Sequence, residues 1–138
     1  MRYWLFKSEP DVFGWDDLVA KGDKGEEWDG VRNYQARNNM REMQIGDQGL
    51  FYHSNIGKQV VGIAEVVAEA HHDSSTDDPR WECVDIKAIM PVKTPLTLDQ
   101  VKAEPRLKDM VLANNSRLSV QPVTAEEWAV VMELVGLS

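Results

Sequence analysis

One stretch of the sequence concentrates side chains that could bind a planar, hydrogen-bonding ligand. Residues 28–38, WDGVRNYQARN, contain two aromatic rings, two arginines and three side-chain amides. Aromatic rings and arginine planes stack on the face of a nucleobase, and amides match the donors and acceptors along its edge. The alternative for Trp28 and Tyr34 is ordinary core packing, and for Arg32 and Arg37 it is a solvated helix face paired with acids.

The basic residues gather around the same stretch. Residues 30–62 carry four Lys or Arg against two acids, whereas residues 9–29 carry eight acids and two lysines. The whole chain has a formal net charge of -8, which argues against broad binding along nucleic-acid phosphates. The pattern therefore predicts a small site for an anionic ligand on an acidic protein.

No sequence motif indicates catalysis. The chain has no glycine-rich phosphate loop, no nucleophile elbow and no HExxH pair. Its single cysteine, Cys83, falls in a predicted strand and is expected to be a buried, inert thiol. His71 and His72 fall in a predicted polar loop over residues 71–79, where adjacent side chains point apart and no third ligand follows at metal-site spacing. We therefore expect no catalytic residue, no metal and no cofactor.

Short strands and helices must position these residues. The 138 residues suit one domain, with 43% hydrophobic and 28% charged residues, as in soluble globular proteins. Gly62, inside a predicted strand, indicates a bulge or a close backbone approach. Because the elements do not alternate as βαβ units, they predict an α+β fold with a small mixed or barrel-like sheet. The predicted strands cover 3–6, 50–53, 60–67, 81–89 and 117–122. Two helices are predicted over 14–20 and 34–41, and two more are predicted to begin after the capping residues Thr97 and Thr124.

Five tryptophans are many for a chain of this length. Four of them fall on predicted strands and helices, where packing explains them: Trp4, Trp15, Trp81 and Trp128. Trp28 instead lies within an acidic, glycine-bearing stretch over residues 23–30 that is typical of a loop. Trp28 is therefore the tryptophan that we expect to serve function.

The sequence also bears on the protein's surroundings. A single cysteine favours a reducing compartment, and no apolar stretch approaches the roughly 18 residues of a membrane helix. The N-terminal segment lacks the apolar core of a signal peptide. We expect a cytoplasmic protein, nuclear if its source has a nucleus, with no membrane partner, and we assume a monomer.

Four blocks of the sequence, taken in order, resemble the EVE domain family. They are residues 3–10 (YWLFKSEP), 28–38, 51–54 (FYHS) and 117–122 (RLSVQP). The resemblance implies a single EVE, PUA-like domain over residues 1–138, with a curved, barrel-like mixed sheet surrounded by short helices and related to PUA and YTH domains. It also implies a noncatalytic domain whose pocket reads a modified nucleobase, methylated or oxidised, in DNA or RNA.

Carried over position by position, the resemblance implies which residues bind the ligand. The aromatic walls and an apolar contact would be Trp28, Tyr34 and Val31. Polar contacts to the ligand or its backbone would be Arg32, Asn33 and Asn38. The other three blocks would complete the rim with Lys7, Ser8, Tyr52, His53, Ser54, Arg117 and Ser119.

Two other functions stay open at this point. The pocket of an enzyme or sensor for a small nucleotide-like metabolite could use His53 and Glu9 as acid and base. A protein interaction module could instead use exposed aromatic residues, although the amides of residues 33–39 favour a polar, planar ligand.

Overall fold

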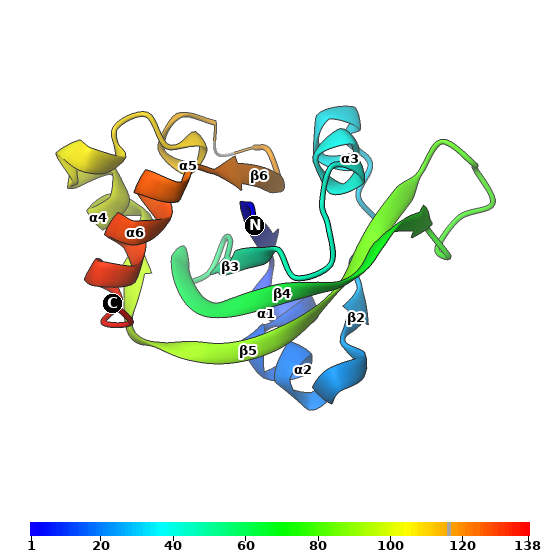
Figure 1. Cartoon of the computed structure of the whole chain (residues 1–138), viewed down its shortest axis with the longest axis horizontal. Coiled ribbons are helices and arrows are strands. Elements are labelled where there is room, and N and C mark those ends of the chain that lie inside the picture. Colours follow the sequence, from blue (N-terminus) through cyan, green and yellow to red (C-terminus); the bar gives the residue numbers. More distant parts are fainter. Residues whose placement is uncertain (116) are drawn as a thin grey trace.

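The structure, a computed structural model, describes residues 1–115 and 117–138 (Figure 1). The strands of these residues form one sheet in the order β2-β5-β4-β3-β1-β6. β1 pairs in parallel with β3, and the other neighbouring pairs are antiparallel. The predicted α+β class and mixed sheet are therefore confirmed. The strands are β1 (Tyr3–Ser8), β2 (Glu26–Glu27), β3 (Gln48–His53), β4 (Gln59–His72), β5 (Glu82–Thr97) and β6 (Val120–Val123).

The long strands β4 and β5 give the sheet its curvature, as Figure 1 shows. The register of this pair shifts at four places, and such irregularities bend antiparallel strands. One shift falls beside Gly62, where a Cβ atom would lie only 2.4 Å from the ring of Trp15. The predicted irregularity and close approach at Gly62 are both confirmed.

Short helices surround the sheet. They are α1 (Pro10–Phe13), α2 (Trp15–Ala20), α3 (Tyr34–Arg41), α4 (Leu98–Ala103), α5 (Val111–Asn114) and α6 (Ala125–Leu134), with short 3-10 turns η1 (Gly22–Lys24) and η2 (Pro105–Leu107). The predicted caps are confirmed, because the hydroxyls of Thr97 and Thr124 accept the backbone N–H groups of Gln100 and Glu127. Within the described residues, no helix has the length and apolar character of a membrane span.

Apolar side chains pack on both faces of the sheet. Trp4 and Phe6 of β1 belong to one core, and Leu5 between them belongs to the other, as the alternation of a strand requires. The indole N–H of Trp4 donates to the buried carboxylate of Asp47 at 3.0 Å. The predicted burial of four tryptophans is confirmed: Trp4, Trp15, Trp81 and Trp128.

Long-range strand pairing corrects two predictions. His71 and His72 are not loop residues, because β4 continues to His72 and pairs these residues with Cys83 and Glu82. Composition predicted a loop there, but the partner strand supplies hydrogen bonds that composition does not reveal. The strand predicted at 117–122 covers only Val120–Val123, so Arg117 and Ser119 precede it.

Candidate functional site

A pocket of about 500 Å³ opens where the end of β1, helix α1, strand β2 and the loop after β2 meet. It is lined by Lys7, Ser8, Glu9, Val12, Phe13, Glu26, Glu27, Trp28, Asp29, Gly30, Val31, Arg32 and Ser119. Six predicted site residues are among them: Lys7, Ser8, Trp28, Val31, Arg32 and Ser119. Three of the four sequence blocks therefore converge on one cavity.

Hydrogen bonds tie the first and last of these blocks together. The backbone N–H of Lys7 donates to the carbonyl of Ser119 at 2.9 Å, and the hydroxyl of Ser8 donates to the carbonyl of Phe13 at 2.6 Å. The Lys7 ammonium lies 5.9 Å from the ring centroid of Tyr52, and burial lowers the pKa of Lys7. The rim at the end of β1 is thus held by contacts within the protein.

Trp28 is both a core residue and part of the pocket wall. It is only 8% exposed, and its backbone N–H donates to the carbonyl of Val84 at 2.8 Å. Its ring makes edge contacts with Phe6, Phe13 and Phe51, at centroid distances of 5.6, 6.1 and 5.7 Å. Core packing and a binding role are therefore compatible for Trp28, because the packing holds the ring rigidly at the pocket.

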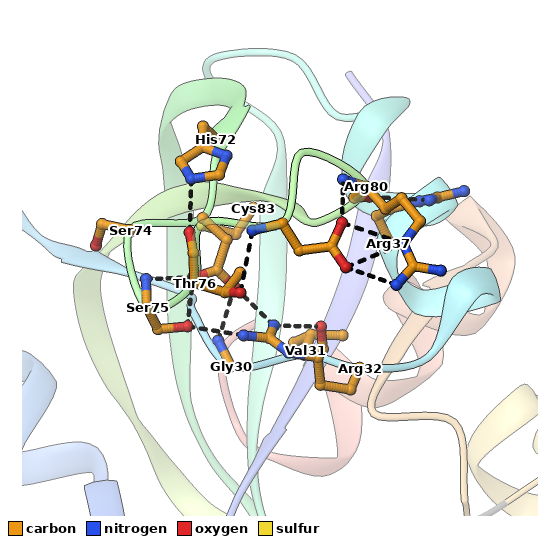
Figure 2. A network of polar contacts seen from close by, with 12 residues as sticks. Gly30, Val31, Arg32, Arg37, His72, Ser74, Ser75, Thr76, Arg80 and Cys83 are labelled. Atoms are coloured by element: carbon orange, nitrogen blue, oxygen red, sulfur yellow. Dashed lines mark hydrogen bonds and ion pairs between the residues drawn. The ribbon is translucent and has the colours of Figure 1, made fainter.

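Asp73 anchors the loop that follows Trp28. Its buried carboxylate accepts the backbone N–H of Gly30 at 2.9 Å and the guanidinium of Arg32 at 3.1 Å. It also accepts hydrogen bonds from the backbone N–H and the hydroxyl of Ser75. Figure 2 shows Gly30, Arg32 and Ser75 close to one another. Burial disfavours the charge, but the hydrogen bonds from Ser75, Gly30 and Arg32 outweigh it and lower the pKa of Asp73 to about 2.

Sequence reasoning missed Asp73. The run Asp73-Ser74-Ser75 is typical of a turn, since an aspartate accepts from the backbone two residues further on. That signal predicts the local bond to Ser75. It does not reveal Gly30 and Arg32, which lie 43 and 41 residues away.

The pocket wall is acidic. Its lining contains four carboxylates, Glu9, Glu26, Glu27 and Asp29, against the two cations Lys7 and Arg32. The expectation that basic residues gather around the site is therefore wrong for this pocket. Charge summed along the chain misplaced the acids, because the folding of β1 and β2 brings the acidic stretch 9–29 around the cavity.

Two of these carboxyl groups differ in their environment. Burial raises the pKa of Asp29, and repulsion from Asp73, Glu27 and Glu26 raises it further. Glu27 accepts the backbone N–H of Ser74 at 2.7 Å and its hydroxyl at 2.8 Å. Burial opposes the charge of Glu27, but these bonds outweigh it and lower its pKa. The carboxylate of Glu27 is thus hydrogen-bonded within the protein, whereas the carboxyl group of Asp29 lies at the pocket among other acidic groups.

The other seven predicted residues do not line this pocket: Asn33, Tyr34, Asn38, Tyr52, His53, Ser54 and Arg117. Asn33 caps helix α3, where its side-chain oxygen accepts the N–H of Ala36 at 2.9 Å. The amide oxygen of Asn38 accepts from the guanidinium of Arg37 at 2.7 Å. Tyr34 is half exposed and stacks on Trp81.

Residues of the third block make contacts within the protein. Tyr52 is buried in the core that contains Leu5. The Nε2 atom of His53 accepts the backbone N–H of Trp15 at 3.0 Å, and burial lowers the pKa of His53. The backbone N–H of Ser54 donates to the carbonyl of Ser8 at 2.9 Å. Arg117 is exposed. Contact of these side chains with a ligand stays a prediction.

A cluster of possible metal donors shares Glu27 with the pocket. One ligand atom each from Glu27, His71 and Cys83 lies within 4.8 Å of the others. The spacing argument missed this group, because strand pairing places His71 opposite Cys83. Both ring nitrogens of His71 already have partners, the carbonyl of His72 at 2.9 Å and Asp85 at 2.7 Å.

Hydrogen bonds within the protein explain why these three side chains lie close together. The bond to Asp85 raises the pKa of His71. The thiol of Cys83 donates to Glu27 at 3.5 Å, and burial raises the pKa of that thiol. The expectation that Cys83 is buried is confirmed.

The chain is similar to known proteins over nearly its whole length. The EVE domain family matches residues 2–134. A solved protein of Agrobacterium tumefaciens is 56% identical, with a TM-score of 0.98 over 99% of this chain and 94% of that one. Human THYN1 protein, solved in complex with 5-methylcytosine containing DNA, is 34% identical, with a TM-score of 0.89 over 98% of both chains.

A more distant likeness concerns the fold alone. The YTH domain of Zygosaccharomyces rouxii MRB1 protein, solved with N6-methyladenosine RNA, is 18% identical. Its TM-score is 0.59 over 97% of this chain and 86% of that one, which supports the predicted PUA-like architecture. The match to residues 2–134 confirms the resemblance of the four sequence blocks, and the chain belongs to the EVE domain family.

Proposed function

We propose that this chain binds a modified nucleobase in DNA or RNA and catalyses no reaction on it. One observation carries the proposal: separate sequence blocks build a single pocket of about 500 Å³ against the rigidly packed ring of Trp28. The related human protein bound to 5-methylcytosine containing DNA supports it. Unstacking a base costs a few kcal/mol, and contact with an aromatic ring returns about 1–3 kcal/mol.

The acidic wall favours a base that carries an amino group. Carboxylates accept hydrogen bonds from the exocyclic amine of cytosine and repel the phosphates of the strand. We assign this role to Asp29, because the other three lining carboxylates have partners: Glu27 is bonded to Ser74, Glu9 to Asn55 and Glu26 to Lys21. Val31 and Phe13, which also line the pocket, offer apolar contact for a methyl group.

The geometry gives less support to an enzyme. The acid and base considered from sequence were His53 and Glu9, but only Glu9 lines the pocket. The Nε2 atom of His53 is occupied by the backbone N–H of Trp15. This pair does not converge on the cavity, which favours binding without turnover.

Binding to matched oligonucleotides tests the proposal. Fluorescence anisotropy at fixed salt would compare single-stranded DNA and RNA probes that differ only in one cytosine, either plain, 5-methylated or 5-hydroxymethylated. We expect tighter binding of at least one modified probe than of its plain counterpart. Equal affinity for all probes, with a steep salt dependence, would instead identify a general backbone binder.

A rim variant links any preference to the pocket. Asp29→Asn should weaken binding of the preferred probe about tenfold, since hydrogen bonds to charged groups contribute about 1.5–3 kcal/mol. Arg41→Ala is the matched control, because Arg41 is exposed on α3 and pairs with Glu82 away from the pocket lining. Equal effects of the two substitutions would contradict the assignment of the pocket.

A further inference from the structure

Tyr34, which the family resemblance placed in the pocket wall, instead forms a separate aromatic platform. The residue is 50% exposed, and its ring stacks on Trp81 with centroids 5.0 Å apart and planes at 23°. The guanidinium of Arg37, one helical turn further along α3, lies 4.8 Å from the Tyr34 centroid. We call Tyr34, Arg37 and Trp81 the Tyr34 platform.

One face of the Tyr34 ring is left uncovered by its two partners. If Arg37 and Trp81 lay on opposite faces of the Tyr34 ring, the distance between them would approach the sum of their distances to the Tyr34 centroid, 5.0 and 4.8 Å. The guanidinium of Arg37 is only 5.9 Å from the Trp81 ring, so it lies beside the stack on the Trp81 side. The hydroxyl of Tyr34 accepts from Arg80 at 3.3 Å, which fixes the edge of the ring. Because Tyr34 as a whole is half exposed, the ring face opposite Trp81 can take another planar group.

The charge on Arg37 is available to an anion. Within the described residues, Arg37 forms no ion pair, and its guanidinium donates to the carbonyl of Arg80 at 2.9 Å and to the amide oxygen of Asn38. The arginines around the platform are each paired with a carboxylate: Arg32 with Asp73, Arg41 with Glu82 and Arg80 with Asp78.

The platform is continuous with the pocket through Arg32. This residue lines the pocket, and its guanidinium also lies 5.3 Å from the Trp81 ring. Figure 2 shows Arg32 between Ser75 on one side and the pair Arg37 and Arg80 on the other. Because the pocket wall is acidic, it repels the phosphates of a bound strand, whereas the guanidinium of Arg37 attracts them.

We propose that the Tyr34 platform stacks the base next to the one held in the pocket, while Arg37 contacts a phosphate of the same strand. The inference rests on the proposed function, because it assumes a nucleic-acid strand whose modified base occupies the pocket. Stacking on an aromatic ring tolerates any base, so the platform would add affinity without reading sequence.

The test combines two probes with variants of the platform. The first probe is a single-stranded DNA oligonucleotide with one 5-methylcytosine, and the second carries abasic nucleotides on both sides of that base. The wild-type protein should bind the second probe about tenfold more weakly, the loss expected for one stacked base. Tyr34→Ala should bind both probes equally, whereas Tyr34→Phe should behave as the wild type.

Arg37→Gln provides an independent readout that does not need the ring. It should lower the slope of log affinity against log salt by about one phosphate contact for either probe. Arg41→Gln, on the same helix and paired with Glu82, should leave slope and affinity unchanged. Circular dichroism would establish that each variant folds.

The outcomes separate this inference from the proposed function. Equal binding of both probes by the wild type, or an equal abasic penalty in wild type and Tyr34→Ala, would overturn the platform while leaving the pocket intact. An abasic penalty that disappears in Tyr34→Ala, without any preference for 5-methylcytosine over cytosine, would support the platform and contradict the modified-base pocket. No binding of either probe would overturn both.

Discussion

Replacing Asp73 by asparagine should loosen the loop that forms one wall of the pocket. The substitution keeps the size of the side chain and removes the charge that receives hydrogen bonds from Gly30, Arg32 and Ser75. Asp73 is 1% exposed, so water cannot replace these partners in the folded protein. The loss should therefore appear both in the stability of the fold and in binding by the pocket.

The pKa of Asp73 sets the size of the effect. It is lowered from 3.8 to about 2, and one pKa unit corresponds to about 1.4 kcal/mol. The charged carboxylate thus contributes about 2 kcal/mol to the free energy of unfolding at neutral pH. Because the folded pKa lies below the unfolded one, this contribution is present above pH 3.8 and is lost as the pH falls through about 2. Arg32, 39% exposed, supplies the smaller part, since solvent screens it.

Urea denaturation at pH 7 and at pH 3 checks this reasoning. Asp73→Asn should lower the free energy of unfolding by about 2 kcal/mol at pH 7 and by about half as much at pH 3, where most unfolded chains carry the proton. Asp77→Asn, which changes an exposed carboxylate of the same loop, should match the wild type at both pH values. A variant as stable as wild type at pH 7, or a loss of equal size at both pH values, would refute the account.

Three further predictions concern groups outside the pocket lining. Burial lowers the pKa of His53 from 6.5, so the free energy of unfolding should fall as the pH drops below 6.5 towards the folded pKa. His53→Gln should flatten that part of a pH profile measured by urea denaturation. An unchanged profile would contradict the bond to Trp15. Cys83, buried with a raised pKa, should react with a disulfide reagent only after unfolding, and rapid labelling of the native protein would count against this burial. Asp47→Ala should cost about 1–3 kcal/mol of unfolding free energy by leaving the indole N–H of Trp4 buried without its partner, and a neutral effect would show that this bond is dispensable.

Local signals predicted the elements that depend on local contacts. Thr97 and Thr124 each precede a residue that completes a capping box, so both helix starts could be placed from sequence. Gly62 marked a close approach to the backbone, although the ring that approaches it belongs to Trp15, far away in the sequence. Each threonine and its capping partner lie three residues apart, so a local pattern reveals both. At Gly62 the signal is the glycine itself, whose missing side chain leaves room for the ring.

Contacts between distant strands could not be predicted in the same way. His71 was expected in a loop, but its pairing with Cys83 extends β4 and creates the polar cluster with Glu27. Asp73 likewise owes its role to Gly30, a residue 43 positions away. The family resemblance placed four blocks at one pocket, and three of them line it. It did not distinguish the lining residues from Tyr34, whose stacking on Trp81 depends on the far end of the loop after β4.

The central claim is that a modified base enters the pocket beside Trp28, and the indole N–H signals of the tryptophans test it most directly. Trp28 lines the pocket, whereas the indole N–H of Trp4 is committed to Asp47 in the core. In an NMR titration with single-stranded DNA containing one 5-methylcytosine, the Trp28 signal should shift more than with the unmodified strand, and the Trp4 signal should stay in place. A Trp28 signal that does not move while other tryptophans respond, or that responds equally to both strands, would contradict the account.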